Sequence, residues 1–212
     1  MNKEGITVAG NLIADVVYTI DVYPQKGNLT RMRNPVVHTG GINNLIIDLA
    51  RLDSKIPIKV SGVVGDDENG QFIVDSLREY PNINIEGIVK KGRTAVTFAM
   101  TEKESKQRTF FFDPGTSLEF NEKQIDFKKI KADIFHLEYL LLLGTLDQPD
   151  EDYGTKAAKV LATAQKYEME TSVDMVSEEG NRYQKVVWPA LKYTDYCVVN
   201  EVEGTGVTGI QL

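Results

Sequence analysis

The sequence predicts an α/β fold in which a mostly parallel central sheet lies between two layers of helices, with a small accessory β-sheet. Short β-branched runs alternate with amphipathic helical stretches over most of the 212 residues, and the connections are compact. Hydrophobic residues make up 42% of the chain, which is enough for a core. Residues 16–37 and 94–112 interrupt the alternation with antiparallel-like β runs, which predict the accessory sheet.

The first half of the chain begins with a predicted buried strand over residues 6–10, a short β-rich run that ends in glycine. In residues 16–37, Tyr23-Pro24 and Lys26-Gly27-Asn28 break up the β-branched residues, which predicts short strands around a turn. Residues 42–52 carry apolar side chains at helical spacing and form the first predicted helix. Next we expect a strand over 58–64, a helix capped by Asp66 or Asp67, and an extended stretch over 83–89.

The second half begins with a predicted hairpin. Its strands are residues 94–101 and 109–112, and the charged segment 102–107 is its loop. Pro189 must lie at a boundary or kink of a later helix, because proline lacks a backbone N–H. After Asn200 only scattered glycines stand out, so we expect little further regular structure. The elements between are strands over 133–137, 171–174 and 196–199, and helices over 153–167 and 184–191.

Composition and charge exclude several classes of protein. With 24 basic and 31 acidic residues the net charge is −7, which argues against a broad nucleic-acid-binding surface. The single cysteine, Cys197, cannot form an internal disulfide and is expected to be an inert core thiol. The longest apolar run, residues 139–143, is far shorter than the ~20 residues of a membrane helix, and no signal peptide is recognisable. We expect a cytoplasmic protein without membrane or nucleic-acid partners.

Three polar clusters lie where predicted strands end, which is where α/β proteins bind ligands. They are Gly10-Asn11 through Asp15, the segment 39–44 with its glycine pair, and the Gly- and Asp-rich segment 62–70. Each cluster alone is also ordinary turn chemistry. Asp15 differs because a carboxylate just past a buried strand needs a partner, and a polyol could donate two hydroxyl groups to it.

Taken together and in this order, the clusters resemble the ribokinase-like (PfkB) carbohydrate kinases. The resemblance extends to the strand end Phe135-His136-Leu137-Glu138 and to Asn200-Glu201-Val202-Glu203. It covers essentially the whole chain and corresponds to the N-terminal two-thirds of such a kinase. It implies a three-layer αβα ribokinase-like sheet, in which the stretches 16–37 and 94–112 form a lid over the substrate.

The resemblance also implies an activity, namely ATP-dependent phosphorylation of a hydroxymethyl group on a sugar, nucleoside or related polyol. Asn200 and Glu203 match the N-x-x-E element of the family, which organises Mg²⁺ and phosphate through water, so no direct metal ligand is expected. Asn43 and Asn44 are alternatives, because this chain has one residue fewer than the family after the glycine pair. A lid-mediated homodimer is a further expectation. The residues implied to bind substrate are Asp15, Asn11, Gly40, Gly41, Asn43, Asn44 and Glu138.

One departure from the family bears on activity. The catalytic base, the anion hole and the nucleotide pocket come from a later Gly-Ala-Gly-Asp-like segment, and this sequence contains none. We therefore expect residues 1–212 to be a single incomplete domain that lacks the C-terminal nucleotide-binding part, has no catalytic residue and is inactive alone. The strand over 196–199 should then lie at an exposed sheet edge.

Two other functions are compatible with parts of the sequence. A non-catalytic sugar-binding or regulatory protein derived from such a kinase is the alternative, because the Gly-Asp segment is missing. A dinucleotide-binding oxidoreductase fits less well, since the first strand is not followed by the G-x-G-x-x-G fingerprint.

Overall fold

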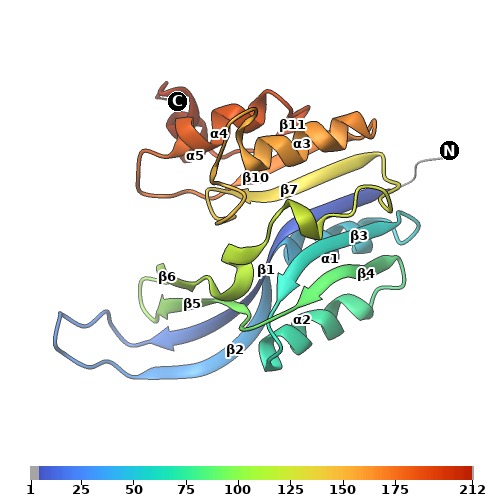
Figure 1. The fold of residues 1–212 in the computed structure, drawn as a ribbon. Coiled ribbons are helices and arrows are strands. Elements are labelled where there is room, and N and C mark those ends of the chain that lie inside the picture. The colour runs from blue at the N-terminus through green and yellow to red at the C-terminus, as the bar shows by residue number, and fades with distance from the viewer. Residues whose placement is uncertain (1–4, 212) are drawn as a thin grey trace.

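The computed structural model describes residues 5–211, and a parallel six-strand path forms the centre of the molecule (Figure 1). Along this path the strand order is β11-β10-β7-β1-β3-β4, and every neighbouring pair is parallel. The predicted α/β sheet is therefore confirmed. The strands are β1 (Ile6–Ile20), β3 (Ile58–Val64), β4 (Ile83–Lys90), β7 (Ile134–Leu140), β10 (Glu170–Met175) and β11 (Tyr196–Cys197).

Helices cover both faces of this sheet and create two cores. Val8 and Ala9 of β1 belong to different cores because successive side chains of a strand point to opposite faces. The Val8 core is completed by α1 (Ile42–Leu52) and α2 (Glu68–Arg78). The Ala9 core is completed by α3 (Lys156–Lys166), α4 (Tyr183–Leu191) and the segment that carries η1 (Gly115–Glu119) and η2 (Glu122–Gln124). Two-residue strands β8 (Pro149–Asp150) and β9 (Gly154–Thr155) form a separate ribbon.

β1 also forms the centre of a second sheet, which we call the lid; the sequence analysis did not foresee that one strand belongs to both sheets. The lid contains β2 (Met32–Gly41), β5 (Ala95–Glu102) and β6 (Arg108–Asp113), and extends away from the central sheet as an arm (Figure 1). β1 pairs with β3 as far as Asn11 and with β2 from Leu12 onward. The prediction of a strand that stops at residue 10 was therefore wrong. The predicted hairpin of β5 and β6 is confirmed, but β1 and β5 pair in parallel.

The C-terminal region also differs from its prediction. Residues after Asn200 form a helix, α5 (Glu201–Thr208), because the side chains of Asn200 and Glu203 form a capping box at its start. Gly206 packs on the ring of Tyr183, where a Cβ atom would be 2.7 Å away. Pro189 lies inside α4 rather than at its end.

Cys197 is exposed, so the prediction of a core thiol was wrong. It belongs to β11, which is only two residues long and ends the sheet path. Val198 and Val199 beyond it are exposed as well, which confirms the expected exposed edge. Among residues 5–211, no helix combines the length and the apolar character that crossing a bilayer requires.

Asp67, one of the two predicted caps, is the N-cap of α2. Its carboxylate accepts hydrogen bonds from the Gly70 amide and the Thr94 amide, both at 2.8 Å, and from the Thr94 hydroxyl. Burial raises the pKa of Asp67, but these hydrogen bonds outweigh it and hold that pKa below its usual value. Asp67 thus fixes the start of α2 to the link between β4 and β5.

Replacing Asp67 with alanine should destabilise the fold by about 2–3 kcal/mol, because a helix cap and a bond to the neighbouring segment are lost together. Thermal melts should show the loss at pH 7. It should shrink below about pH 4, because a group with a lowered folded pKa stabilises the protein only while it is ionised. The exposed neighbour Asp66→Ala is the matched control; equal melting temperatures for the two variants would contradict this assignment.

Candidate functional site

Asp15 lies where β1 passes from the central sheet into the lid. Its carboxylate rests against Gly40 of β2, where a Cβ atom would lie 2.4 Å from both carboxylate oxygens. In the lid register Asp15 is opposite His38 on β2 and Thr97 on β5, and Thr97 is opposite Phe112 on β6. Residues opposite one another share a face of a sheet, so these four side chains form one row across the lid.

The carboxylate of Asp15 has acceptor capacity to spare. Burial raises its pKa, while a hydrogen bond from Thr97 and the charge of His38 act in the opposite direction. A carboxylate offers about four acceptor positions, and Asp15 is only half-buried. A ligand that carries several hydroxyl groups can therefore reach it and donate to it.

The glycine pair lets the start of α1 approach β1 closely. Gly41 has φ +62°, and a Cβ atom there would lie 2.1 Å from the backbone oxygen of Asn11. Gly41 is the N-cap of α1, and no side chain caps the helix there. Only glycine combines this backbone conformation with this contact. The first turn of α1 therefore opens directly beside Asp15 with its N–H groups uncapped by side chains.

Burial distinguishes Asn43 from Asn44, which the sequence left as alternatives. Asn43 is fully buried, and its Nδ2 donates to the carbonyls of Gly40 at 2.6 Å and Ile13 at 3.3 Å. Asn44 is exposed, and its Oδ1 accepts from the Thr39 hydroxyl at 3.5 Å. Asn43 thus ties the glycine pair to β1, whereas Asn44 is open to a bound molecule.

Asn11 and Glu138 are also buried, at 1% and 2% exposure. Asn11 donates from Nδ2 to the Leu142 carbonyl at 2.8 Å. Glu138 lies 3.3 Å from Nε2 of His136, whose Nδ1 is 3.0 Å from the Ser172 hydroxyl. Hydrogen bonds to neighbouring protein groups therefore fix both side chains in place.

Tyr139 lies near the end of β7, and Asp174 lies near the end of β10. Burial raises the pKa of Tyr139, and the charges of Glu138, Asp174 and Asp15 raise it further, so all three carboxylates lie within electrostatic range of its hydroxyl. Sequence reasoning missed both residues. Asp174 could have been found, because it ends a predicted strand just as the polar cluster after the first strand does.

Asn200 and Glu203 form a closed hydrogen-bond network. Glu203 accepts from the Asn200 amide at 3.0 Å, from Asn200 Nδ2 at 2.8 Å and from the Ser177 hydroxyl at 2.7 Å. The Glu203 amide donates to Asn200 Oδ1 at 3.0 Å. Glu203 is 5% exposed, and no group of three or more metal-ligating side chains occurs within residues 5–211.

A model of the pfkB family of carbohydrate kinases matches residues 3–212. The chain belongs to the pfkB family. The expected family is thus confirmed. No curated protein matches the sequence.

Several solved structures share the pfkB fold at low sequence identity. Ribokinase from Arabidopsis thaliana, complexed with ribose and ATP, is 16% identical with a TM-score of 0.74, covering 98% of this chain and 63% of that one. Fructokinase from Xylella fastidiosa with bound ATP is 22% identical with a TM-score of 0.66, covering 92% and 60%. A nucleoside kinase from Methanocaldococcus jannaschii is 16% identical with a TM-score of 0.72, covering 100% and 66%. The pfkB chain therefore spans 60 to 66% of the length of these relatives.

Asp174 of the pfkB chain gives a pH-dependent prediction. Burial and the charges of Glu138 and Glu203 raise its pKa to about 6. Between about pH 4 and about pH 6, Asp174 is ionised in the unfolded chain but protonated in the folded one. The folded protein therefore loses stability as the pH rises through this range. Asp174→Asn removes this loss and should melt a few degrees above wild type at pH 7 but not at pH 4.

Thermal melts over this pH range test the Asp174 prediction. The exposed Asp48→Asn on α1 is the control and should follow wild type at each pH. A variant Asp174→Asn that melts below wild type at pH 7 would contradict the expected sign.

Proposed function

We propose that this chain is the substrate-binding part of an ATP-dependent kinase that phosphorylates a hydroxymethyl group of a sugar, nucleoside or related polyol. The observation that carries the proposal is the half-buried carboxylate of Asp15. It packs against Gly40 at the base of the lid and has acceptor positions available for further hydrogen bonds. Family membership supports the same reaction class. The chain would be one incomplete domain of the kinase, as its share of the relatives' length suggests.

In this proposal each side chain acts according to its accessibility. Asp15 accepts hydrogen bonds from two hydroxyl groups of the polyol, and exposed Asn44 adds an amide. Buried Asn11 and Asn43 hold the surrounding backbone, and buried Glu138 is paired with His136. The glycine pair admits the ligand close to α1. The lid covers the bound polyol and excludes water, which prevents wasteful hydrolysis of ATP.

ATP and Mg²⁺ belong to the proposed reaction but not to the site described above. When bound, the ion neutralises the charge of the transferred phosphoryl group. The atoms of Glu203 are already engaged in hydrogen bonds, so a direct ligand role does not fit. The proposed part of Asn200 and Glu203 is indirect, through water. We assign no catalytic residue to this chain and propose that it is inactive alone, in the cytoplasm where ATP is available.

Titration calorimetry with D-ribose, D-fructose and adenosine, each with and without ATP, tests the proposal. We expect one polyol to bind, no affinity for ATP and no phosphorylated product. Absence of binding to all three polyols would count against it. A longer protein that adds a Gly-x-Gly-Asp segment should phosphorylate the same polyol.

A non-catalytic sugar-binding or regulatory protein is the second candidate, because residues 1–212 contain no Gly-Ala-Gly-Asp-like segment. It predicts polyol binding without phosphorylation by any natural form of the protein.

We also propose that the lid forms a homodimer through the face opposite Asp15. Val16 follows Asp15 directly in β1, so its side chain points to the opposite face of the lid. Phe98 and Phe111 pair with it across the sheet and share that face, where they are 37% and 54% exposed. Phe111→Glu should convert a dimer into a monomer in analytical ultracentrifugation, because a charge would be buried. The control is Phe110→Glu, which is also exposed but on the Asp15 face. A wild-type monomer would contradict the dimer.

A further inference from the structure

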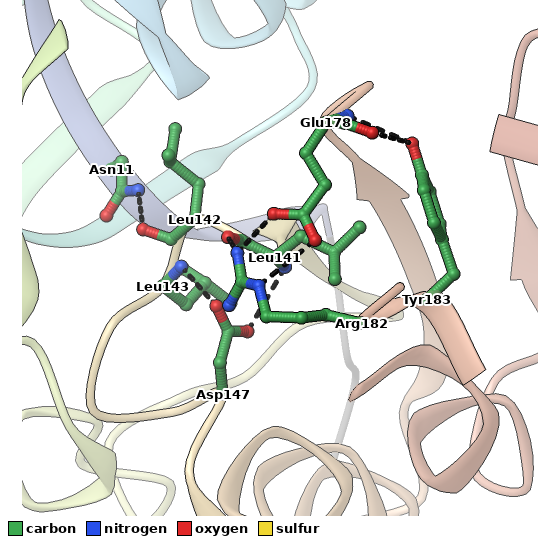
Figure 2. A network of polar contacts seen from close by, with 8 residues as sticks. All are labelled: Asn11, Leu141, Leu142, Leu143, Asp147, Glu178, Arg182 and Tyr183. Atoms are coloured by element: carbon green, nitrogen blue, oxygen red, sulfur yellow. Dashed lines mark hydrogen bonds and ion pairs between the residues drawn. The ribbon is translucent and has the colours of Figure 1, made fainter. Parts of the chain in front are cut away.

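Asp147 holds the loop that follows β7 (Figure 2). The side chain is 6% exposed, and its two oxygens accept from the amides of Leu141 at 3.2 Å and Leu143 at 2.9 Å. Leu141 has φ +76°, a conformation that side-chain-bearing residues rarely adopt. A backbone of this kind persists only where its surroundings fix it, and Asp147 supplies two of the bonds that do so.

Arg182 holds the same loop from the other side. Its guanidinium donates to the Leu141 carbonyl at 2.6 Å and is paired with Glu178 through Nε at 3.0 Å. Figure 2 shows Arg182 reaching across from the start of α4 to the loop. Leu141 is thus held at its N–H by Asp147 and at its carbonyl by Arg182.

The loop in turn fixes Asn11. The Leu142 carbonyl accepts the Nδ2 hydrogen bond of Asn11 at 2.8 Å. The backbone oxygen of Asn11 packs against Gly41, the N-cap of α1. Displacement of Leu142 would therefore move Asn11, and through it the glycine pair. It would also disturb Asp15, which lies four residues further along β1.

We propose that Asp147 and Arg182 are positioning residues for the polyol site, acting through the Leu142 carbonyl and Asn11. The inference about affinity rests on the proposed function, whereas the effect on Asn11 does not. Burial raises the pKa of Asp147 to about 6, with the backbone bonds and the charge of Arg182 opposing that rise, which agrees with a carboxylate enclosed by the loop it holds.

The test compares Asp147→Asn and Arg182→Ala with Asp150→Asn. Asp150 is the matched control, because it also accepts two backbone amides, from Asp152 and Tyr153 at 3.1 Å each, but in a different turn. One readout is the NMR signal of the Asn11 side-chain amide, assigned by its loss in Asn11→Asp. The other is the affinity for D-ribose, D-fructose and adenosine.

Both test variants should shift the Asn11 amide signal and lower the affinity for the bound polyol roughly tenfold, while the control does neither. The Arg182 side chain is half exposed, so its variant should fold even where Asp147→Asn does not. Asn11 signals that move no more than in the control would overturn the proposal, as would shifted signals with unchanged affinity. If wild type binds none of the three polyols, the proposed function fails, and the Asn11 signal still decides whether Asp147 and Arg182 position that side chain.

Discussion

Asp15→Ala should abolish polyol binding while leaving the fold intact. A hydrogen bond to a charged group contributes about 1.5–3 kcal/mol, so the loss of two such bonds should weaken binding at least ~100-fold. The melting temperature should not fall, because burial raises the pKa of Asp15 and its ionised form therefore costs stability at neutral pH. Calorimetry with the polyol that wild type binds and a thermal melt at pH 7 measure the two effects.

The control for Asp15 is Asp48→Ala, an exposed carboxylate on α1. It changes the net charge equally but should keep wild-type affinity. If Asp15→Ala bound the polyol as Asp48→Ala does, the site would have to lie elsewhere on the molecule.

Gly40→Ala should be nearly as damaging to binding, for a steric reason. The added Cβ atom would lie 2.4 Å from both oxygens of Asp15, which is too close for a real contact, so the carboxylate must move away. The backbone of Gly40 is not in the left-handed region, and a side chain can yield cheaply. We expect a near-wild-type melting temperature and an affinity loss comparable to that of Asp15→Ala.

Gly180→Ala is the matched control for Gly40, because its Cβ atom would meet only the side chain of Glu178, at ordinary distances of 3.4 Å from Oε1 and 3.9 Å from Cδ. Combining Gly40→Ala with Asp15→Ala should cost little more affinity than either change alone, since both act on one carboxylate. Additive losses would show that Gly40 affects binding by another route.

The order of strands and helices could be predicted because it depends on local hydrophobic spacing. The extension of β1 could not, because its later residues are held by β2 and β5, which are distant in sequence. The helix after Asn200 could not be predicted, because three glycines obscure its capping box and the same two side chains match the N-x-x-E element of the family.

Strand ends and glycines in the sequence predict where the site lies, but not which of its side chains are buried or exposed. Asn43 and Asn44 carry the same chemistry, and only the packing of α1 buries one and exposes the other. Nothing in the sequence near Asp147 shows that its acceptors face the amides of Leu141 and Leu143, since that depends on the left-handed turn at Leu141.

The continuity of β1 has a consequence for motion. Since one unbroken strand is bonded first to β3 and β7 and then to β2 and β5, β1 joins the arm to the central sheet without an intervening loop that could act as a hinge. The arm can open and close only by a bend in the strand near Asn11 to Ile13. Amide exchange should therefore be slow along most of β1, and the arm and the body should unfold as one cooperative unit.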